Sequence, residues 1–310
     1  MIYLKKAIMT LAACLAAASF ASAQDGAALS FTRIARDPVS VGMGFSGIAS
    51  THNVGYSSFR NSSVIPFASE RLSVGASGQI WAPSGVKSTN LAFGSAFRTG
   101  ERLGFAIGGA YQMGEEYMST DETGNYAGTF KPNDLMVNAG VGVRIIENLA
   151  VGVNARYASQ KLSADNSYSA FSADVFLTYR LSGLNICAGV SSLGTSVKSA
   201  SGDSFVLPTS ACVGVEWIKA FTDTHGLRVT ADADYCFSGD VTAACGAEYS
   251  FRDLIFLRAG YHYGAADKGL PSFASVGLGV KFAGVQLDAA CLLASETLGG
   301  SLTLGLGYSF

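Results

Sequence analysis

The sequence predicts an all-β protein: an antiparallel, up-and-down transmembrane β-barrel of about fourteen strands, with an N-terminal segment that plugs it. Apolar residues alternate with small or polar residues in many segments of the roughly 9–11 residues that a tilted transmembrane strand needs. The links between these segments alternate between short and long, as in outer-membrane barrels. The first residues are typical of a signal peptide, so we expect the chain to reach the outer membrane of a bacterial cell.

The signal peptide is predicted from the order of charge, apolar run and cleavage site. Lys5 and Lys6 supply the positive start, and residues 7–20 form an almost unbroken apolar run. Ala21-Ser22-Ala23 then gives the small-x-small site of signal peptidase, so Gln24 is the expected first residue of the mature chain. The apolar run is shorter than the roughly 20 residues of a spanning helix, which argues against a membrane anchor.

Composition excludes several other classes of protein. Charged residues make up 14% of the chain, against about 25% in a typical globular protein, and glycine reaches 37 residues. After the signal peptide no stretch approaches 18 consecutive apolar residues, which excludes a helical membrane protein. A formal net charge of −2 predicts no nucleic-acid partner. The remaining cysteines have no CxxC spacing, so neither a metal site, a cofactor nor a disulfide framework is expected; they are Cys187, Cys212, Cys236, Cys245 and Cys291.

The last strand shows the alternation plainly. One face carries only aliphatic and aromatic side chains, and the other carries small ones; the first set is Leu302, Leu304, Leu306, Tyr308 and Phe310. We expect the first set to face lipid. The final aromatic pair, Tyr308 and Phe310, resembles the signal by which barrel proteins engage the outer-membrane assembly machinery, which is therefore an expected partner together with outer-membrane lipid.

The same alternation marks all the predicted strands: 71–81, 88–98, 103–113, 135–145, 149–159, 170–180, 184–192, 208–218, 227–237, 241–251, 254–264, 273–282, 285–293 and 301–310. Because periplasmic turns are short and extracellular loops longer, the link lengths place both ends of the barrel in the periplasm. Two links break the rule: 238–240 is short where a long loop is expected, and 219–226 is long where a short turn is expected.

The chain therefore divides into a signal peptide (1–23), an N-terminal segment (24–70) and the barrel (71–310). Residues 24–70 do not alternate and are rich in Gly, Ser and Asn. A flexible tail is the simpler interpretation. A segment of this length before the first strand can instead fill the lumen, as plugs do in many barrels.

Catalysis is not expected. The chain has three histidines and no GxSxG nucleophile motif. Five polar residues point inward by strand parity, and we interpret them as a lumen cluster whose charges are paired, as buried charges normally are; they are Arg228, Asp232, Asp234, Arg258 and His262.

Two stretches carry a family resemblance. The first contains Gly42, Met43, Gly44, Gly47, Ala49 and Asn61, and the second contains Asp121, Gly124, Phe130, Pro132 and Asn133. Together they resemble the PorV/PorQ family, FadL-like outer-membrane proteins of Bacteroidetes with fourteen-stranded barrels. The chain departs from the family where Asn61-Ser62-Ser63 stands in place of Asn-Pro-Ala.

The resemblance implies a non-enzymatic component of the type IX secretion system. Such a protein binds the translocon, the C-terminal signal domains of secreted cargo and a sortase-like attachment enzyme, and the loop 114–134 would be the first contact surface. A FadL-like transporter of hydrophobic small molecules is the alternative, for which the lumen aromatics Trp81 and Phe176 are suited. An accessory barrel of another outer-membrane complex is a third possibility.

Overall fold

The computed structural model describes residues 28–82, 87–120, 125–163, 166–198, 204–264, 270–293, 298 and 300–310. The predicted signal peptide, residues 1–23, lies outside this described part of the chain. Within it, no helix has the length and hydropathy of a membrane-spanning helix.

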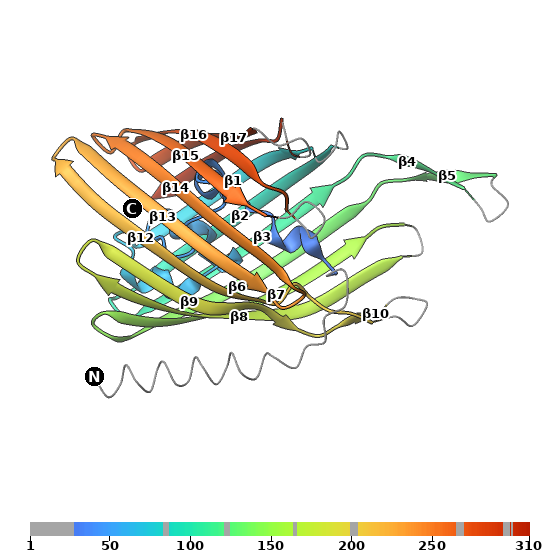
Figure 1. Ribbon diagram of the computed structural model, residues 1–310, viewed down its shortest axis with the longest axis horizontal. Coiled ribbons are helices and arrows are strands. Elements are labelled where there is room, and N and C mark those ends of the chain that lie inside the picture. The colour runs from blue at the N-terminus through green and yellow to red at the C-terminus, as the bar shows by residue number, and fades with distance from the viewer. Residues whose placement is uncertain are drawn as a thin grey trace.

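Fourteen antiparallel strands form a closed barrel in which β1 pairs with β18 (Figure 1). The strands are β1 (Leu72–Trp81), β2 (Ser88–Thr99), β3 (Leu103–Met113), β6 (Asn133–Ile146), β7 (Leu149–Lys161), β8 (Ser167–Leu181), β9 (Leu184–Gly194), β12 (Ser210–Thr222), β13 (His225–Cys236), β14 (Asp240–Phe251), β15 (Ile255–Tyr263), β16 (Phe273–Phe282), β17 (Val285–Leu293) and β18 (Leu302–Ser309). The predicted fourteen-stranded, up-and-down barrel is confirmed.

One link differs from its prediction. The stretch 219–226 is not a long loop, because β12 continues to Thr222 and β13 begins at His225, with a register shift between Ala220 and Thr222. The backbone ladder continues here although the apolar alternation has faded, since strands near the membrane surface no longer need lipid-facing side chains. The link 237–239 between β13 and β14 is short, as the sequence indicates.

The barrel has two different ends. One end, the short-turn rim, carries the start of β1, the end of β18 and the tight turns such as 147–148 and 283–284. The other end, the long-loop rim, carries two small hairpins, β4 (Tyr117–Thr120) with β5 (Tyr126–Phe130) and β10 (Val197–Lys198) with β11 (Ser204–Phe205). The β4–β5 hairpin projects well beyond the barrel (Figure 1). Short turns are periplasmic in outer-membrane barrels, so we assign the short-turn rim to the periplasm.

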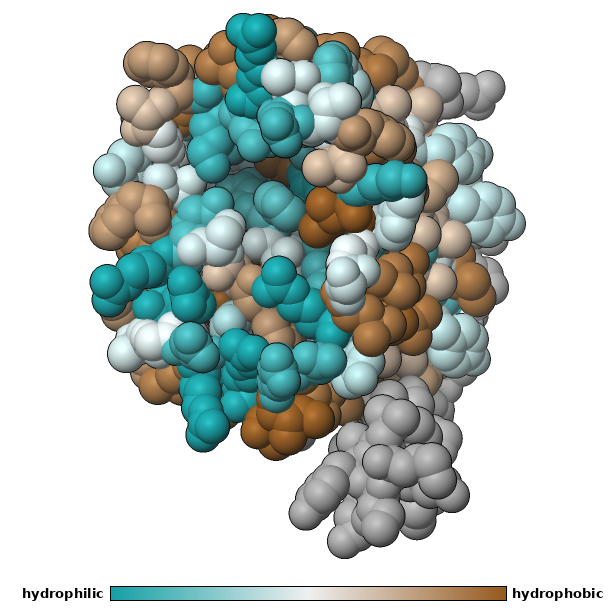
Figure 2. Space-filling view, turned by 90° about the vertical axis from the view of Figure 1, so that its left-hand side faces the viewer, coloured by the Kyte–Doolittle hydropathy of each residue, from teal (hydrophilic) through white to brown (hydrophobic). Residues whose placement is uncertain are grey.

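The outer wall is apolar and the inner wall is small or polar. In β18, Leu304 is 54% exposed whereas its neighbour Thr303 is 1% exposed. Figure 2 looks onto the short-turn rim and shows hydrophilic side chains around a hollowed centre, with hydrophobic side chains toward the circumference. This division matches a wall with lipid outside and polar contacts inside.

Residues 28–70 lie inside the barrel and are called the plug below. The plug contains three 3₁₀-helices and one short α-helix: η1 (Ser30–Arg33), α2 (Pro38–Gly42), η2 (Val54–Phe59) and η3 (Ser62–Phe67). Ala28 donates its N–H to Val206 O at the long-loop rim (3.0 Å). At the other end, Arg180 of β8 donates to Phe67 O (2.8 Å), just before the chain enters β1. The plug therefore runs from one rim to the other.

Glycines on the inner wall let the plug approach at backbone distance. A Cβ at Gly260 of β15 would lie 2.1 Å from the carbonyl carbon of Met43, and one at Gly94 of β2 would lie 2.5 Å from Gly55 O. No side chain fits at either position without displacing plug backbone. The inner surface of the barrel is thus shaped to this plug.

We predict that Gly260→Val displaces the plug and costs about 1–3 kcal/mol of stability, because the added methyl groups overlap backbone. Trypsin should cleave within residues 28–70 faster in this variant. The folded barrel, detected by its gel shift, should unfold at a lower temperature. Gly78→Val is the control, since a Cβ at Gly78 meets only the Leu91 side chain at 3.8 Å. Equal behaviour of the two variants would contradict the prediction.

Candidate functional site: the plugged lumen

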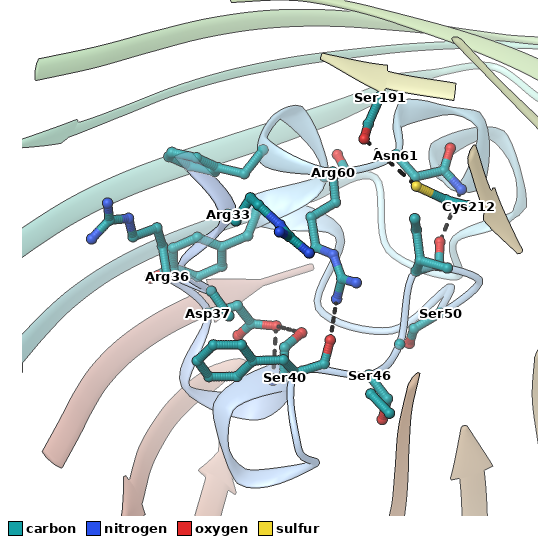
Figure 3. Close-up of a pocket in the computed structure, with 18 of the residues that line it drawn as sticks. Arg33, Arg36, Asp37, Ser40, Ser46, Ser50, Arg60, Asn61, Ser191 and Cys212 are labelled. Atoms are coloured by element: carbon teal, nitrogen blue, oxygen red, sulfur yellow. Dashed lines mark hydrogen bonds between the residues drawn. The ribbon is translucent and has the colours of Figure 1, made fainter. Parts of the chain in front are cut away.

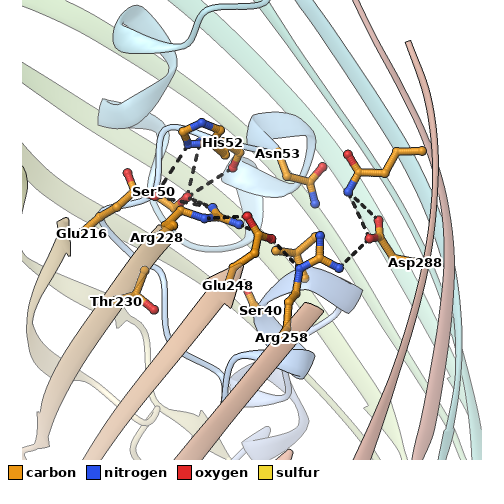
Figure 4. Close-up of polar contacts among 12 residues, drawn as sticks. Ser40, Ser50, His52, Asn53, Glu216, Arg228, Thr230, Glu248, Arg258 and Asp288 are labelled. Atoms are coloured by element: carbon orange, nitrogen blue, oxygen red, sulfur yellow. Dashed lines mark hydrogen bonds and ion pairs between the residues drawn. The ribbon is translucent and has the colours of Figure 1, made fainter. Parts of the chain in front are cut away.

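A ladder of alternating charges crosses the inner wall of the barrel (Figure 4). On β13, Arg228 contacts Glu216 of β12 (Nη1 to Oε1, 3.4 Å) and Glu248 of β14 (Nη2 to Oε2, 2.8 Å). The same Glu248 oxygen accepts from Arg258 Nε of β15 (2.5 Å), and Arg258 Nη1 donates to Asp288 Oδ1 of β17 (2.6 Å). Every member is buried and paired, which offsets the large cost of removing charges from water.

The sequence prediction included Arg228 and Arg258 but missed Glu216, Glu248 and Asp288. Glu248 could have been found, because the short turns at 237–239 and 252–254 place it directly opposite both arginines. Glu216 is harder to find, since it lies diagonal to Arg228 instead of opposite it. Asp288 is harder still, since β16 lies between its strand and that of Arg258.

Asp232 of β13 binds the plug instead of the ladder. Its Oδ2 accepts from the backbone N–H groups of Gly47 (2.8 Å) and Ile48 (2.9 Å), and from Arg60 Nη2 of the plug (3.3 Å). Glu216 acts similarly, accepting from Thr51 N (3.1 Å). Two barrel carboxylates therefore satisfy plug backbone groups that have no secondary structure to bond them.

The two other predicted lumen residues lie apart from the ladder. Asp234 is half-buried farther along β13. His262 of β15 is 5% exposed and stacks on Phe273, with ring centroids 4.9 Å apart. The structure thus joins Arg228 to Arg258 through Glu248 but does not bring all five predicted residues into one cluster.

Most of the N-terminal motif residues lie at the end of α2 and in the turn that follows it, and Asn61 lies at the start of η3. Gly44 has φ +71° and donates its N–H to Ser275 Oγ (2.8 Å), and Gly42 lies against Gly277 of β16. Asn61 donates to Ile48 O (2.9 Å) and accepts from Ser63 N at the start of η3. The others, Met43, Gly47 and Ala49, pack within the same turn, where Met43 and Ala49 are fully buried. The motif positions the plug.

Asp37 fixes the start of α2 (Figure 3). Its carboxylate accepts from Val39 N (3.0 Å), Ser40 N (3.3 Å) and Asn53 Nδ2 (2.7 Å). Burial raises the pKa of Asp37, and the hydrogen bonds from Val39 N and Ser40 Oγ, which favour the charged form, oppose that rise.

The predicted loop residues are only partly described. Asp121 and Gly124 lie outside the described residues. Phe130 packs on Tyr117 across the β4–β5 hairpin (5.8 Å between ring centroids), Pro132 O accepts from Gly114 N (2.9 Å), and Asn133 begins β6. These residues form the base of the projecting hairpin.

The C-terminal aromatics Tyr308 and Phe310 lie at the short-turn rim and are 46% and 61% exposed. Phe310 O accepts from the N–H groups of Arg71 and Leu72, which ties the chain end to the start of β1. Recognition of this pair by the assembly machinery stays a prediction.

Aromatic and aliphatic side chains fill the long-loop half of the lumen. Phe45 of the plug packs on Phe273 (4.9 Å between centroids) and on Trp81 (6.3 Å), beside Phe31 and Leu292. Trp81 is 5% exposed, so it faces inward as expected for a lumen aromatic. Phe176 is also buried but belongs to a separate group with Ile48, Ala49, Cys187 and Cys212.

Two cavities remain around the plug. A cavity of about 160 Å³ lies among plug residues and reaches the walls of β6, β8 and β13. A second, of about 410 Å³, lies toward the short-turn rim and is lined by four residues of the charge ladder, Arg228, Glu248, Arg258 and Asp288. Val39, His52, Asn53, Tyr56 and Arg228 line both cavities and so form the partition between them. Across the described ranges, no group of three His, Cys, Asp or Glu side chains is arranged to hold a metal ion.

Comparison with known proteins identifies solved structures of similar fold. No protein-family model and no curated protein matches the chain. The structure is similar to the Ralstonia pickettii toluene transporter TbuX (TM-score 0.60, 14% identity, 88% of this chain and 98% of that one). It is also similar to the monoaromatic hydrocarbon channel CymD (TM-score 0.58, 15% identity, 88% of this chain and 97% of that one). A third similar structure is a Pseudomonas aeruginosa FadL homologue (TM-score 0.53, 12% identity, 88% of this chain and 98% of that one).

The fold is therefore that of the FadL-like outer-membrane barrels. These neighbours are transporters and channels, not enzymes. The more specific PorV/PorQ assignment stays a prediction.

We predict that Asp232→Ala loosens the plug, because two plug N–H groups and Arg60 lose their acceptor at a cost of about 1–3 kcal/mol. Ion conductance through single barrels in a planar bilayer should rise, and trypsin should cleave after Arg60 more readily. Asp234→Ala is the matched control, since Asp234 forms no ion pair within the described residues. A plug that stays closed and protected in the Asp232 variant would refute the anchor role.

Proposed function

We propose that this protein is a non-enzymatic outer-membrane channel that binds and admits small hydrophobic molecules. The observation that carries the proposal is the apolar group of Phe45, Trp81, Phe273 and Leu292 inside the barrel, at the long-loop end. This group packs Phe45 of the plug against the wall and gives this half of the lumen an apolar lining. The likeness to a toluene transporter and a monoaromatic hydrocarbon channel supports the same interpretation.

The two halves of the lumen indicate the order in which a permeating molecule would meet apolar and charged surfaces. A hydrophobic molecule that enters at the long-loop rim meets the apolar half first and gains free energy as its surface leaves water. Farther down it meets the partition at Val39 and Asn53, beyond which the charge ladder lines the lumen. Passage toward the periplasm therefore requires the plug to shift or open at this partition.

The two tryptophans provide a direct test. Trp81 lies in the lumen, and Trp217 lies on the lipid face at 41% exposure. In a Trp217→Phe variant, titration with toluene should change Trp81 fluorescence saturably. In the matched Trp81→Phe variant, the emission of Trp217 should show no saturable change. Identical responses from both variants would mean that toluene only partitions into the surrounding detergent or lipid.

A role in protein secretion is the second candidate, favoured by the projecting β4–β5 hairpin. Met118 is 75% exposed and Tyr126 is 67% exposed on this hairpin, beyond the barrel. Exposed apolar side chains at such a place are typical of a protein-binding surface. If the type IX role applies, these residues contact the translocon, the cargo or the attachment enzyme.

For this second role, we predict that purification from detergent-solubilised outer membranes recovers translocon or cargo proteins. The double variant Met118→Ser/Tyr126→Ser should recover several-fold less, because it removes the apolar contact without altering the barrel. Val213→Ser/Val215→Ser, on the lipid face of β12, is the matched control. Recovery of the wild-type barrel alone would count against secretion.

A further inference from the structure

Arg36 is a buried cation in the plug with two free hydrogen-bond donors. It lies between η1 and α2, is 4% exposed, and donates from Nη2 to Phe31 O (3.0 Å). Its Nε and Nη1 have no partner in the part of the chain that the structure describes. Burial lowers the pKa of Arg36 to about 10, so the guanidinium is still charged at neutral pH.

The other arginines around the same cavity are paired. Arg33 contacts Asp240 (3.0 Å), Arg60 contacts Asp232 (3.3 Å) and Arg156 contacts Asp174 (2.8 Å), while Arg228 belongs to the charge ladder. Among the described residues, Arg36 has no carboxylate within ion-pair distance. Asp134 of β6 acts on it only from farther away. In Figure 3 the guanidinium of Arg36 points away from those of Arg33 and Arg60.

The cavity that Arg36 lines has the size of one aromatic ring. Its volume is about 160 Å³. An engineered apolar cavity of about 150 Å³ in another protein binds benzene. Ile34, Phe45, Phe59 and Met136 supply apolar lining of the same cavity.

A second free polar group lines the same cavity. His262 is 5% exposed, and neither of its ring nitrogens has a hydrogen-bond partner among the described residues. The cavity therefore combines an apolar surface with buried polar groups that await partners. A plain hydrocarbon would leave them unpaired, which costs free energy for each buried group.

We propose that this cavity binds a one-ring aromatic anion, with a carboxylate that accepts hydrogen bonds from Arg36. This inference rests on the proposed function and narrows its ligand class from hydrocarbons to aromatic acids. The negative carboxylate would neutralise the buried guanidinium, and the ring would occupy the apolar lining. Arg36 thereby determines specificity between acids and hydrocarbons of equal size.

Benzoate and toluene are the matched probes, because they share one ring and differ in the carboxylate. Binding of each is measured on the purified full-length protein by the fluorescence of Trp81 in the Trp217→Phe background. We expect benzoate to bind at least about tenfold more tightly than toluene. Arg36→Met should weaken benzoate binding roughly 10- to 100-fold and change toluene binding by no more than about twofold.

Two further variants keep the test decisive. Arg102→Met removes an exposed arginine at the turn before β3 and should leave both affinities unchanged. Arg36→Lys keeps the buried charge if the Met variant does not fold, and should weaken benzoate less than Met does. Unchanged benzoate affinity in a folded Arg36 variant would overturn the inference, while toluene binding would leave the channel proposal standing. If the wild-type protein bound neither probe, both proposals would fail.

Discussion

The closure of β1 onto β18 is the constraint on which the rest of the structure depends. Inside a bilayer, a backbone N–H or C=O without a partner costs several kcal/mol, so a sheet can cross only if it has no free edge. The register from Ser73 against Ser309 to Ile80 against Leu302 removes that edge. Once the wall is closed, its outer face must be apolar, and all chemical variety is confined to the lumen.

The lumen then has to be filled without leaving polar groups unpaired. The plug contributes much irregular backbone. Carboxylates of the inner wall accept hydrogen bonds from some of its N–H groups, and glycines of the wall lie where no side chain fits beside it. Five further charges on β12 to β17 are paired with one another in the charge ladder: Glu216, Arg228, Glu248, Arg258 and Asp288. The charge ladder lies toward the short-turn rim, and the apolar group of Phe45, Trp81, Phe273 and Leu292 lies toward the long-loop rim. In the proposed channel, a molecule that enters at the long-loop rim meets the apolar group before it meets the charge ladder.

The sequence predicted the strands well because the pattern of a barrel strand is local: each side chain faces either lipid or lumen, and the two alternate from one residue to the next. Among the links that the structure describes, the wrongly predicted one, 219–226, lies where this pattern fades at the membrane surface. The contacts of the plug were beyond such reasoning, because they depend on how an irregular segment folds against distant strands. Nothing near Arg60 in the sequence indicates that it meets Asp232, 172 positions later.

The path of the plug through the barrel also constrains how the protein is made. The plug joins the start of β1, yet its first described residue is bonded near β11 at the opposite rim. Several wall positions touch plug backbone so closely that they admit only glycine. Drawing such a segment through a finished barrel would force it past these contacts. The geometry therefore favours an assembly order in which the first and last strands join around a plug that is already in place, so that closing the barrel is also the step that encloses its contents.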